Sequence, residues 1–224
     1  MNTKIEKKRK IGILGGTFDP VHRVHLELAK KARMQYDLTE VWLMPSGDPP
    51  HKSGRSITPG WQRLELLKLA LTGAKGLVAS DYELRRSGKI YTAETLERLS
   101  AEIPDVEWYF IMGGDSLLYL DEWYHPEKIF RYAVILAAVR KEADSLSEQF
   151  SFAILEQKRQ QLLYRFPEAK ISFLQTTADD LSSSLLRALL TKSERSVQEE
   201  AFLKKSLPEC VYSYLLEHDL YKQG

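Results

Sequence analysis

The sequence predicts an α/β fold with a doubly wound parallel sheet, and two observations carry this prediction. Apolar runs typical of buried strands alternate with stretches of helical periodicity along the chain. The first run, at residues 11–14, is followed by a helical pattern from Val21 and by a second run at residues 41–44. A strand, a helix and a strand in so short a length form a βαβ unit, which requires parallel strands and a right-handed crossover.

The rest of the chain continues this alternation. Further apolar runs predict strands at residues 77–79, 106–112, 133–139 and 171–174. Helices are expected after Pro59, with Leu64, Leu67, Ala70 and Leu71 on the inner face, and from an N-cap at Thr92. A polar loop at residues 141–148, a long helix at residues 150–166 and a helix capped by Ser182 or Ser183 follow.

The chain is expected to have three parts. Residues 1–10 read as a short, solvated basic tail, residues 11–190 as one domain, and residues 191–224 as a helical appendage packed on that domain. Pro208 divides the appendage into two short helices. A chain of 224 residues is long enough to bury a proper core.

Composition excludes several classes of function. The net charge of +1 at pH 7 gives no overall field that favours nucleic acid or a membrane surface. The single cysteine, Cys210, allows neither an intramolecular disulfide nor a thiolate metal cluster, which fits a reducing compartment. Because the sequence has no long apolar run and no secretory signal, we expect a cytoplasmic protein; a homo-oligomer stays open.

The stretch at residues 15–25 carries the strongest chemical signal. Gly15 and Gly16 let the chain turn sharply and bring bare backbone close to a ligand. His22 and His25 are three residues apart, so they share one face of the first helical turn. A helix N-terminus favours phosphate, and two imidazoles add hydrogen-bond donors near neutral pH. The alternative is a surface helix that happens to carry two histidines.

A second anion site is predicted near the other end of the chain. Ser183 and Ser184 open a helix, and Arg187 falls one turn later on their face. Hydroxyls, free backbone N–H groups and a guanidinium together suit an anion. A serine-rich helix start is common, so this signal is weak alone and more specific in combination with the first motif.

Both motifs resemble one family. Residues 15–25, Gly-Gly-Thr-Phe-Asp-Pro-Val-His-Arg-Val-His, are similar to the signature of nucleotidyltransferases related to class I aminoacyl-tRNA synthetases, whose hallmark is His-x-Gly-His. Val24 stands in place of the family glycine. Residues 182–187 resemble the family's Ser-Ser-Thr-x-Ile-Arg, with Ser184 for Thr and Leu186 for Ile. The resemblance covers residues 11–190 and implies a Rossmann-like fold.

The resemblance also implies roles for individual residues. His22, His25 and Arg187 would be catalytic, with His25 nearest the α-phosphate of ATP. The remaining residues expected to bind ATP are Gly15, Gly16, Thr17, Phe18, Asp115, Ser183 and Ser184. Asp115 follows two glycines at the end of a strand, where a carboxylate can hold a ribose hydroxyl; capping of the next helix is the alternative.

One branch of the family is resembled more closely. Tyr82-Glu83-Leu84, then Tyr91-Thr92 with Thr95-Leu96, and the segment from Asp115 to Trp123 look like nicotinate-nucleotide adenylyltransferase. In that branch, Tyr91 and Thr92 would face the pyridine carboxylate, and Trp123 would stack on the pyridine ring. From the pattern alone, capping explains Thr92, and core or interface packing explains Trp123.

Two basic residues complete the predicted mononucleotide site. Lys52 lies in a proline-rich loop after the second strand, where Pro-His-Lys again resembles the family. Arg140 directly follows the strand at residues 133–139. Each side chain could reach a phosphate. Solvated loop charge for Lys52 and a surface carboxylate partner for Arg140 are the alternatives.

The implied activity is adenylyl transfer from ATP to nicotinate mononucleotide, giving deamido-NAD and pyrophosphate in NAD biosynthesis. Mg²⁺ is the expected cofactor, held mainly by substrate phosphates rather than by a protein metal site. Asp19 is a minor candidate for contact with it, and turn formation with Pro20 is the alternative. A related transferase for another phosphorylated small molecule, or a nucleotide-binding protein impaired by Val24, stays open. The choice between nicotinate and nicotinamide mononucleotide also stays open.

Overall fold

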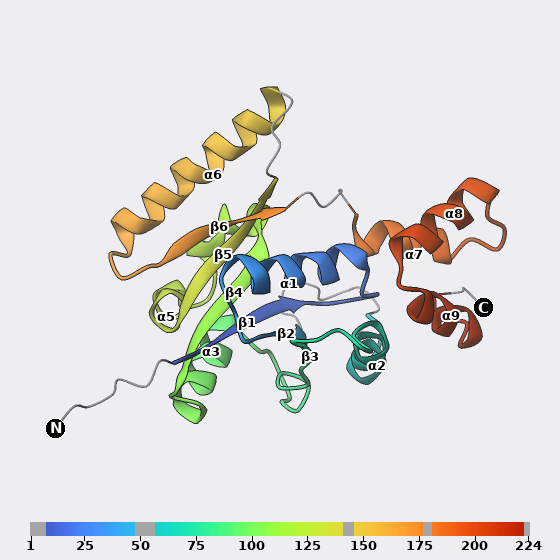
Figure 1. The fold of residues 1–224 in the computed structure, drawn as a ribbon, viewed down its shortest axis with the longest axis horizontal. Helices are drawn as coiled ribbons and strands as arrows, with labels where there is room; N and C mark the ends of the chain where they lie inside the picture. The colour runs from blue at the N-terminus through green and yellow to red at the C-terminus, as the bar shows by residue number, and fades with distance from the viewer. Residues whose placement is uncertain (1–7, 48–56, 141–145, 177–180, 222–224) are drawn as a thin grey trace.

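Six parallel strands form one sheet, in the order β3-β2-β1-β4-β5-β6. The computed structural model describes residues 8–47, 57–140, 146–176 and 181–221. Helices lie on both faces of the sheet (Figure 1). The predicted doubly wound sheet is therefore confirmed. Its strand order reverses between β1 and β4, which is where such sheets form their ligand crevice.

All six predicted strands are present, most of them one or two residues longer than expected. β1 pairs with β2 on one side and with β4 on the other, so that Gly12 lies opposite both Val41 and Tyr109. The bounds are β1 Arg9–Gly16, β2 Glu40–Pro45, β3 Leu77–Ala79, β4 Val106–Gly113, β5 Ala133–Arg140 and β6 Ile171–Thr176.

The sheet separates two hydrophobic cores. In β4, Trp108 and Phe110 enter the core on one face, whereas Tyr109 and Ile111 enter the core on the other. All four side chains are buried, as expected for a central parallel strand covered by helices on both sides. The edge formed by the carboxyl ends of the strands is thus held between two packed layers.

The helices follow the predicted order with some differences. The long helix begins at Leu146, so residues 146–148, which the sequence placed in a loop, are helical. Three short helical pieces occupy the segment between β4 and β5. The bounds are α1 Arg23–Gln35, α2 Gly60–Ala70, α3 Thr92–Glu102, α4 Gly114–Leu117, η2 Leu120–Glu122, α5 Pro126–Tyr132, α6 Leu146–Arg165, α7 Ser183–Leu190, α8 Val197–Ser206 and α9 Glu209–Glu217.

The buried face of α2 agrees with the prediction in part. Leu67 and Leu71 are buried as expected, and Ala70 packs against the core, whereas Leu64 is only half-buried. The helix also buries Arg63 and Leu66. The arginine was not expected there, because a search for apolar periodicity passes over a charged residue.

Of the helix caps considered from the sequence, Thr92 is wrong, the alternative role of Asp115 is excluded and Ser182 is confirmed. Thr92 is the first residue of α3, preceded by Tyr91 at the cap position, and no side chain caps this helix. Asp115 lies inside α4, so the alternative that it caps a helix fails. Ser182 caps α7 as predicted, since its Oγ accepts a 3.2 Å hydrogen bond from the backbone N–H of Leu185.

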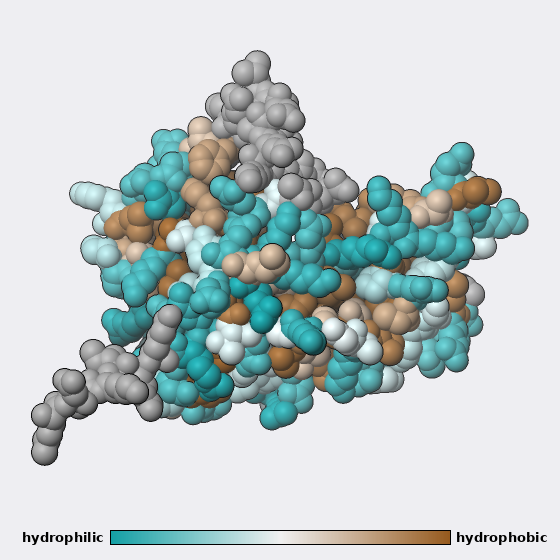
Figure 2. Space-filling model, viewed as in Figure 1, coloured by the Kyte–Doolittle hydropathy of each residue, from teal (hydrophilic) through white to brown (hydrophobic). Residues whose placement is uncertain are grey.

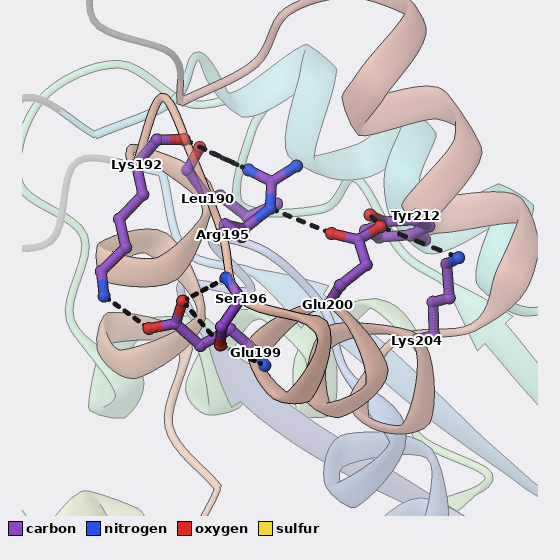
Figure 3. A network of polar contacts seen from close by, with 8 residues as sticks. All are labelled: Leu190, Lys192, Arg195, Ser196, Glu199, Glu200, Lys204 and Tyr212. Atoms are coloured by element: carbon purple, nitrogen blue, oxygen red, sulfur yellow. Dashed lines mark hydrogen bonds and ion pairs between the residues drawn. The ribbon is translucent and has the colours of Figure 1, made fainter.

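The C-terminal helices α8 and α9 pack on the same core as α1 and α2. Leu203, Leu207 and Val211 are completely buried there. A polar network ties the two helices to the end of α7 (Figure 3). Its centre is Glu200, which accepts a 3.0 Å bond from Arg195 Nε and a short bond from the Tyr212 hydroxyl. The predicted appendage of two helices therefore shares the hydrophobic core on one face of the sheet.

The face shown in Figure 2 is mostly polar, with apolar residues visible in small patches between the polar ones. This agrees with the burial of the large aliphatic side chains in the two cores. Among the described residues, no helix combines the length and the hydrophobicity that a membrane crossing requires.

Candidate active site

The carboxyl ends of β1, β2 and β4 meet at the reversal point of the sheet, beside a pocket of about 360 Å³. Gly15, Gly16 and Thr17 at the end of β1 form part of its wall. Another part of the wall comes from the start of α3 and from the segment after β4, through Tyr91, Thr92, Ser116, Trp123 and Tyr124. Two predicted groups of residues, from the first motif and from the mononucleotide site, therefore line one cavity.

The two imidazoles lie at the start of α1, as predicted. His22 precedes the helix, His25 is in its first turn, and their rings stack with centroids 3.7 Å apart. The backbone N–H of His22 donates a 3.3 Å hydrogen bond to Nδ1 of His25. Because Nδ1 of His25 is an acceptor, the proton of the neutral ring sits on Nε2. His25 therefore presents an Nε2–H donor.

Burial keeps both rings neutral at pH 7. His22 is only 3% exposed, and burial lowers its pKa to about 4. Burial and the neighbouring His22 lower the pKa of His25 well below its ordinary value. The sequence suggested donors near neutral pH; each neutral ring provides one N–H rather than two. Nδ1 of His22 is buried without a hydrogen-bond partner in the described part of the chain.

Phe18 is not placed to touch a nucleotide with its ring. The ring is 1% exposed and packs edge-on against His25, with centroids 4.8 Å apart. Its backbone has φ of 51°, in the left-handed region that a bulky residue rarely adopts. A Cβ on Gly16 would lie 3.3 Å from the Phe18 ring, so a glycine suits this close approach. The side chain of Phe18 therefore supports the His25 ring, and only its backbone remains for contact with a ligand.

The second motif lies against the first. Ser183 Oγ donates a 3.0 Å hydrogen bond to the carbonyl of Pro20. Arg187 Nη1 donates to the carbonyl of Asp19 at 2.5 Å, and Nη2 donates to Ser184 Oγ at 3.1 Å. The N-terminal turns of α1 and α7 are thereby held next to each other. The hydroxyl proton of Ser183 is used in this contact, which leaves its backbone N–H at the open helix end.

Arg63 is a structural residue of this site that the sequence analysis missed. Its guanidinium, 2% exposed, donates to backbone carbonyls of Thr17, Ser46 and Thr58 at 2.7, 2.8 and 2.8 Å. These carbonyls belong to the segments after β1, after β2 and before α2. The planar fork of donors thus fixes three loops around the pocket. One feature of the sequence could have indicated this role: Arg63 lies one turn before Leu67, on the buried side of the helix.

The aromatic residues of the pocket form two pairs. Trp123 is half-buried and meets the edge of Phe110, with ring centroids 6.3 Å apart. Tyr91 stacks on Tyr124 at 4.2 Å with the planes inclined by 30°. Flat rings that line an apolar pocket suit an aromatic ligand. The sequence indicated Trp123 and Tyr91 but not their partners, because Phe110 was expected only as part of a buried strand and Tyr124 lies between two short helical pieces.

Glu83 adds a buried carboxyl group to the pocket wall. Thr95 Oγ donates a 2.8 Å hydrogen bond to it, and Arg86 Nη1 lies 3.3 Å from the same hydroxyl. Burial raises the pKa of Glu83 in spite of these partners. The resemblance had included Glu83 in a motif without assigning it a role.

The other predicted residues are less well placed or lie outside the description. Asp115 is exposed, and a Cβ on Gly113 would lie 2.4 Å from its Oδ1, so the carboxylate folds back over a glycine. Its neighbour Ser116, rather than Asp115, lines the pocket. Lys52 lies outside the described residues, and Arg140 ends β5 with a side chain that is likewise not described.

Comparison with protein families gives one match over most of the chain. The family described as cytidylyltransferase-like matches residues 13–189. A probable nicotinate-nucleotide adenylyltransferase from Lachnoclostridium phytofermentans is 39% identical, covering 95% of this chain and 99% of that protein. A probable nicotinate-nucleotide adenylyltransferase from a Synechococcus strain is 36% identical, covering 97% and 99%.

Solved structures share the fold. The nicotinic acid mononucleotide adenylyltransferase of Plasmodium falciparum, complexed with NaAD, superposes with a TM-score of 0.73 at 20% identity. The match covers 95% of this chain and 97% of that one. A putative nicotinate-nucleotide adenylyltransferase from Vibrio parahaemolyticus gives a TM-score of 0.64 at 16% identity, over 96% and 97%. At these identities the likeness concerns the fold.

Proposed function

The chain belongs to the cytidylyltransferase-like family, in its branch of nicotinate-nucleotide adenylyltransferases, and we propose that it transfers the adenylyl group of ATP to nicotinate mononucleotide. The products are deamido-NAD and pyrophosphate, and the reaction is a step of NAD biosynthesis. Membership rests on the match over residues 13–189 and on the 39% identity that extends across 95% of the chain.

One structural observation supports the chemistry most strongly: Arg187 is bonded to the carbonyl of Asp19, three residues before His22. Two helix N-termini, one with imidazoles and one with hydroxyls and a guanidinium, are therefore adjacent. Each N-terminus carries free N–H groups and a partial positive charge, which favour phosphate. Side by side they suit a chain of phosphates rather than a single one.

The reaction requires alignment more than chemical activation. An oxygen of the mononucleotide 5′-phosphate attacks the α-phosphorus of ATP, and the bond from that phosphorus to the pyrophosphate oxygen breaks. The attacking phosphate is already ionised, so no protein nucleophile and no strong general base are needed. The protein must hold two polyanions in line and stabilise the developing charge, and each of these contributes roughly several kcal/mol.

In our proposal, the two helix ends act on different phosphates. His25 donates its Nε2–H to an α-phosphate oxygen, and His22 stacks behind it. Ser184, Arg187 and the open N–H groups of α7 hold the departing pyrophosphate. Arg187 is suited to this because Nη1 and Nη2 are already oriented by Asp19 and Ser184, which leaves its remaining N–H groups for the anion.

The mononucleotide would occupy the pocket. Trp123 would stack on the pyridine ring, with Tyr91 and Thr92 near its carboxylate. Backbone from Gly15 to Thr17 would separate the pyridine from the triphosphate. Asp115, Lys52 and Arg140 keep their predicted roles toward ribose and phosphate as part of this proposal.

We expect Mg²⁺ to enter this site bound to the phosphates of the substrate. Most side chains around the two helix ends are hydrogen-bond donors, Asp19 supplies a single carboxylate, and within the described ranges no three His, Cys, Asp or Glu side chains gather to hold a metal. Phosphate oxygens would then hold the ion, which neutralises part of their charge when bound. We expect the reaction in the cytoplasm, where a thiol such as Cys210 stays reduced.

The test is a product assay with the purified protein. ATP, Mg²⁺ and nicotinate mononucleotide are incubated together, and dinucleotide and pyrophosphate are measured by chromatography. We expect the two products in equal amounts, and a parallel reaction with nicotinamide mononucleotide measures the preference between the two pyridines. ATP binding without product would favour a nucleotide-binding protein, and product only with phosphopantetheine or with glycerol phosphate and CTP would favour a related transferase.

A further inference from the structure

The chain's last described residue reaches back to the first motif. The hydroxyl of Tyr221 donates a 2.6 Å hydrogen bond to Oδ1 of Asp19, which lies 202 residues earlier. Asp19 is 3% exposed, so the bond is made in the interior. Burial, followed by the charge of Asp19, raises the pKa of Tyr221, which keeps the hydroxyl protonated and able to donate.

Asp19 is the residue that joins the two helix ends. Its own carbonyl accepts the bond from Arg187. On one side is Phe18, whose ring packs on His25, and on the other is Pro20, whose carbonyl accepts from Ser183. A rotation of the Asp19 backbone would therefore move three groups that are proposed to face the phosphates.

The Asp19 carboxylate has the guanidinium of Arg187 within reach. Its Oδ2 lies 3.9 Å from Arg187 Nη1, a distance too long for a hydrogen bond, and accepts a long 3.5 Å bond from the backbone N–H of Thr58. Tyr221 holds the other oxygen, Oδ1. Without that hydroxyl, Oδ1 would be a buried acceptor that lacks its donor. The Asp19 carboxylate would regain a donor by rotating toward Arg187.

Tyr221 itself is held in an unusual conformation. Its φ is 72°, in the left-handed region, and Asp219, two residues earlier, has φ of 48°. The chain there leaves α9 through a 3.1 Å bond from the backbone N–H of Leu220 to the carbonyl of Leu215. A bulky residue keeps such a conformation only when its surroundings fix it. The bond to Asp19 is one such constraint.

We propose that Tyr221 is a positioning residue for adenylyl transfer, which holds the carboxylate of Asp19 away from Arg187 so that the remaining N–H groups of the guanidinium are available for pyrophosphate. The proposal rests on the function proposed above. The C-terminal segment after α9 then belongs to the active site. Tyr221 itself affects the reacting atoms only through Asp19. The structure thus gives the appendage a role beyond covering the core.

A matched pair of variants tests this. Tyr221→Phe removes one buried hydroxyl that donates to a carboxylate, and Tyr212→Phe removes another in the same helical part, where the partner is Glu200 (Figure 3). Both should lower the melting temperature to a similar extent. Only Tyr221→Phe should lower kcat/KM for ATP, by about tenfold to a hundredfold, because a misplaced charged group costs this much. KM for the mononucleotide should stay unchanged in both.

The route through Asp19 has its own test. In an Asp19→Asn background, Tyr221→Phe should lower kcat/KM for ATP much less than it does alone, because the two changes disturb one contact. Equal kinetics of the two tyrosine variants, or a full additional loss in the Asp19→Asn background, would overturn the proposal. Absence of dinucleotide with the unmodified protein would instead refute the proposed function.

Discussion

Arg187 Nη1 lies 2.5 Å from the carbonyl oxygen of Asp19, although 168 residues separate them along the chain. Ser183 Oγ makes the neighbouring bond, at 3.0 Å, to the carbonyl of Pro20. Both acceptors belong to the turn that leads into the paired imidazoles, so α7 is seated against the start of α1. The contact brings the donors of two helix N-termini to one place on the molecule.

His25→Ala should reduce kcat by about a hundredfold to a thousandfold, because it removes a donor that acts on charge developing in the transition state. Loss of the ring contacts with His22 and Phe18 should lower the free energy of unfolding, but the protein should remain folded at room temperature. Steady-state kinetics and thermal unfolding measure the two effects. His25→Gln, which restores an N–H, should recover part of the rate; a near-normal rate for His25→Ala would remove the residue from the mechanism.

The buried histidine predicts acid sensitivity of the fold. Because the pKa of His22 is about 4 in the folded protein against 6.5 ordinarily, the unfolded chain binds more protons between these values. The free energy of unfolding therefore falls as the pH drops through this window, by up to about 1.4 kcal/mol per pH unit for one histidine. Above pH 6.5 both the folded and the unfolded state carry a neutral ring, so His22 no longer makes the free energy of unfolding depend on pH.

Denaturant unfolding of the protein and of His22→Asn, followed from neutral pH down to pH 4, checks this prediction. The variant should show a shallower loss of stability on acidification, whatever its stability at neutral pH. Parallel curves for the two proteins would mean that His22 titrates normally in the folded state.

Trp123→Ala should raise KM for nicotinate mononucleotide roughly tenfold to a hundredfold, as expected for loss of one ring stacked on an aromatic ligand. KM for ATP should hardly change, because Trp123 lines the pocket rather than the helix ends. Trp61→Ala is the control, since that ring is 62% exposed and does not line the pocket. Similar effects of both changes on the mononucleotide would refute the stacking role.

Much of this site could be predicted because its signals are local. The strand, two glycines and the histidine pair follow one another in sequence, and Ser182 caps α7 as the motif suggested. What was missed depends on distant contacts. Arg63 looks like a solvated charge until three loops bring their carbonyls to it, and nothing in the pattern connects Tyr221 with Asp19.

Other properties were out of reach for different physical reasons. The protonation of the imidazoles depends on burial, which spacing alone does not report. The three helical pieces between β4 and β5 are too short for a 3.6-residue period to emerge, so Tyr124 was not recognised as the partner of Tyr91. The buried side of α2 was predicted only in part, because a charged residue occupies it.

Val24→Gly tests whether the departure from the family motif matters. Val24 is half-buried in the first turn of α1, between the two histidines along the chain. If its methyl groups crowd the nucleotide, the glycine variant should bind ATP more tightly in calorimetric titration. Its free energy of unfolding should fall by roughly 1 kcal/mol or less, because glycine is the poorer helix former. Unchanged affinity would show that the valine is accommodated.

A crystal structure with Mg²⁺ and an ATP analogue that has a methylene group between the α- and β-phosphates tests the central claim most directly. The account predicts one triphosphate across both helix ends, with an α-phosphate oxygen about 3 Å from His25 Nε2 and the terminal phosphates on Ser184 and Arg187. A triphosphate that contacts only one helix end, or that lies away from both, would contradict it.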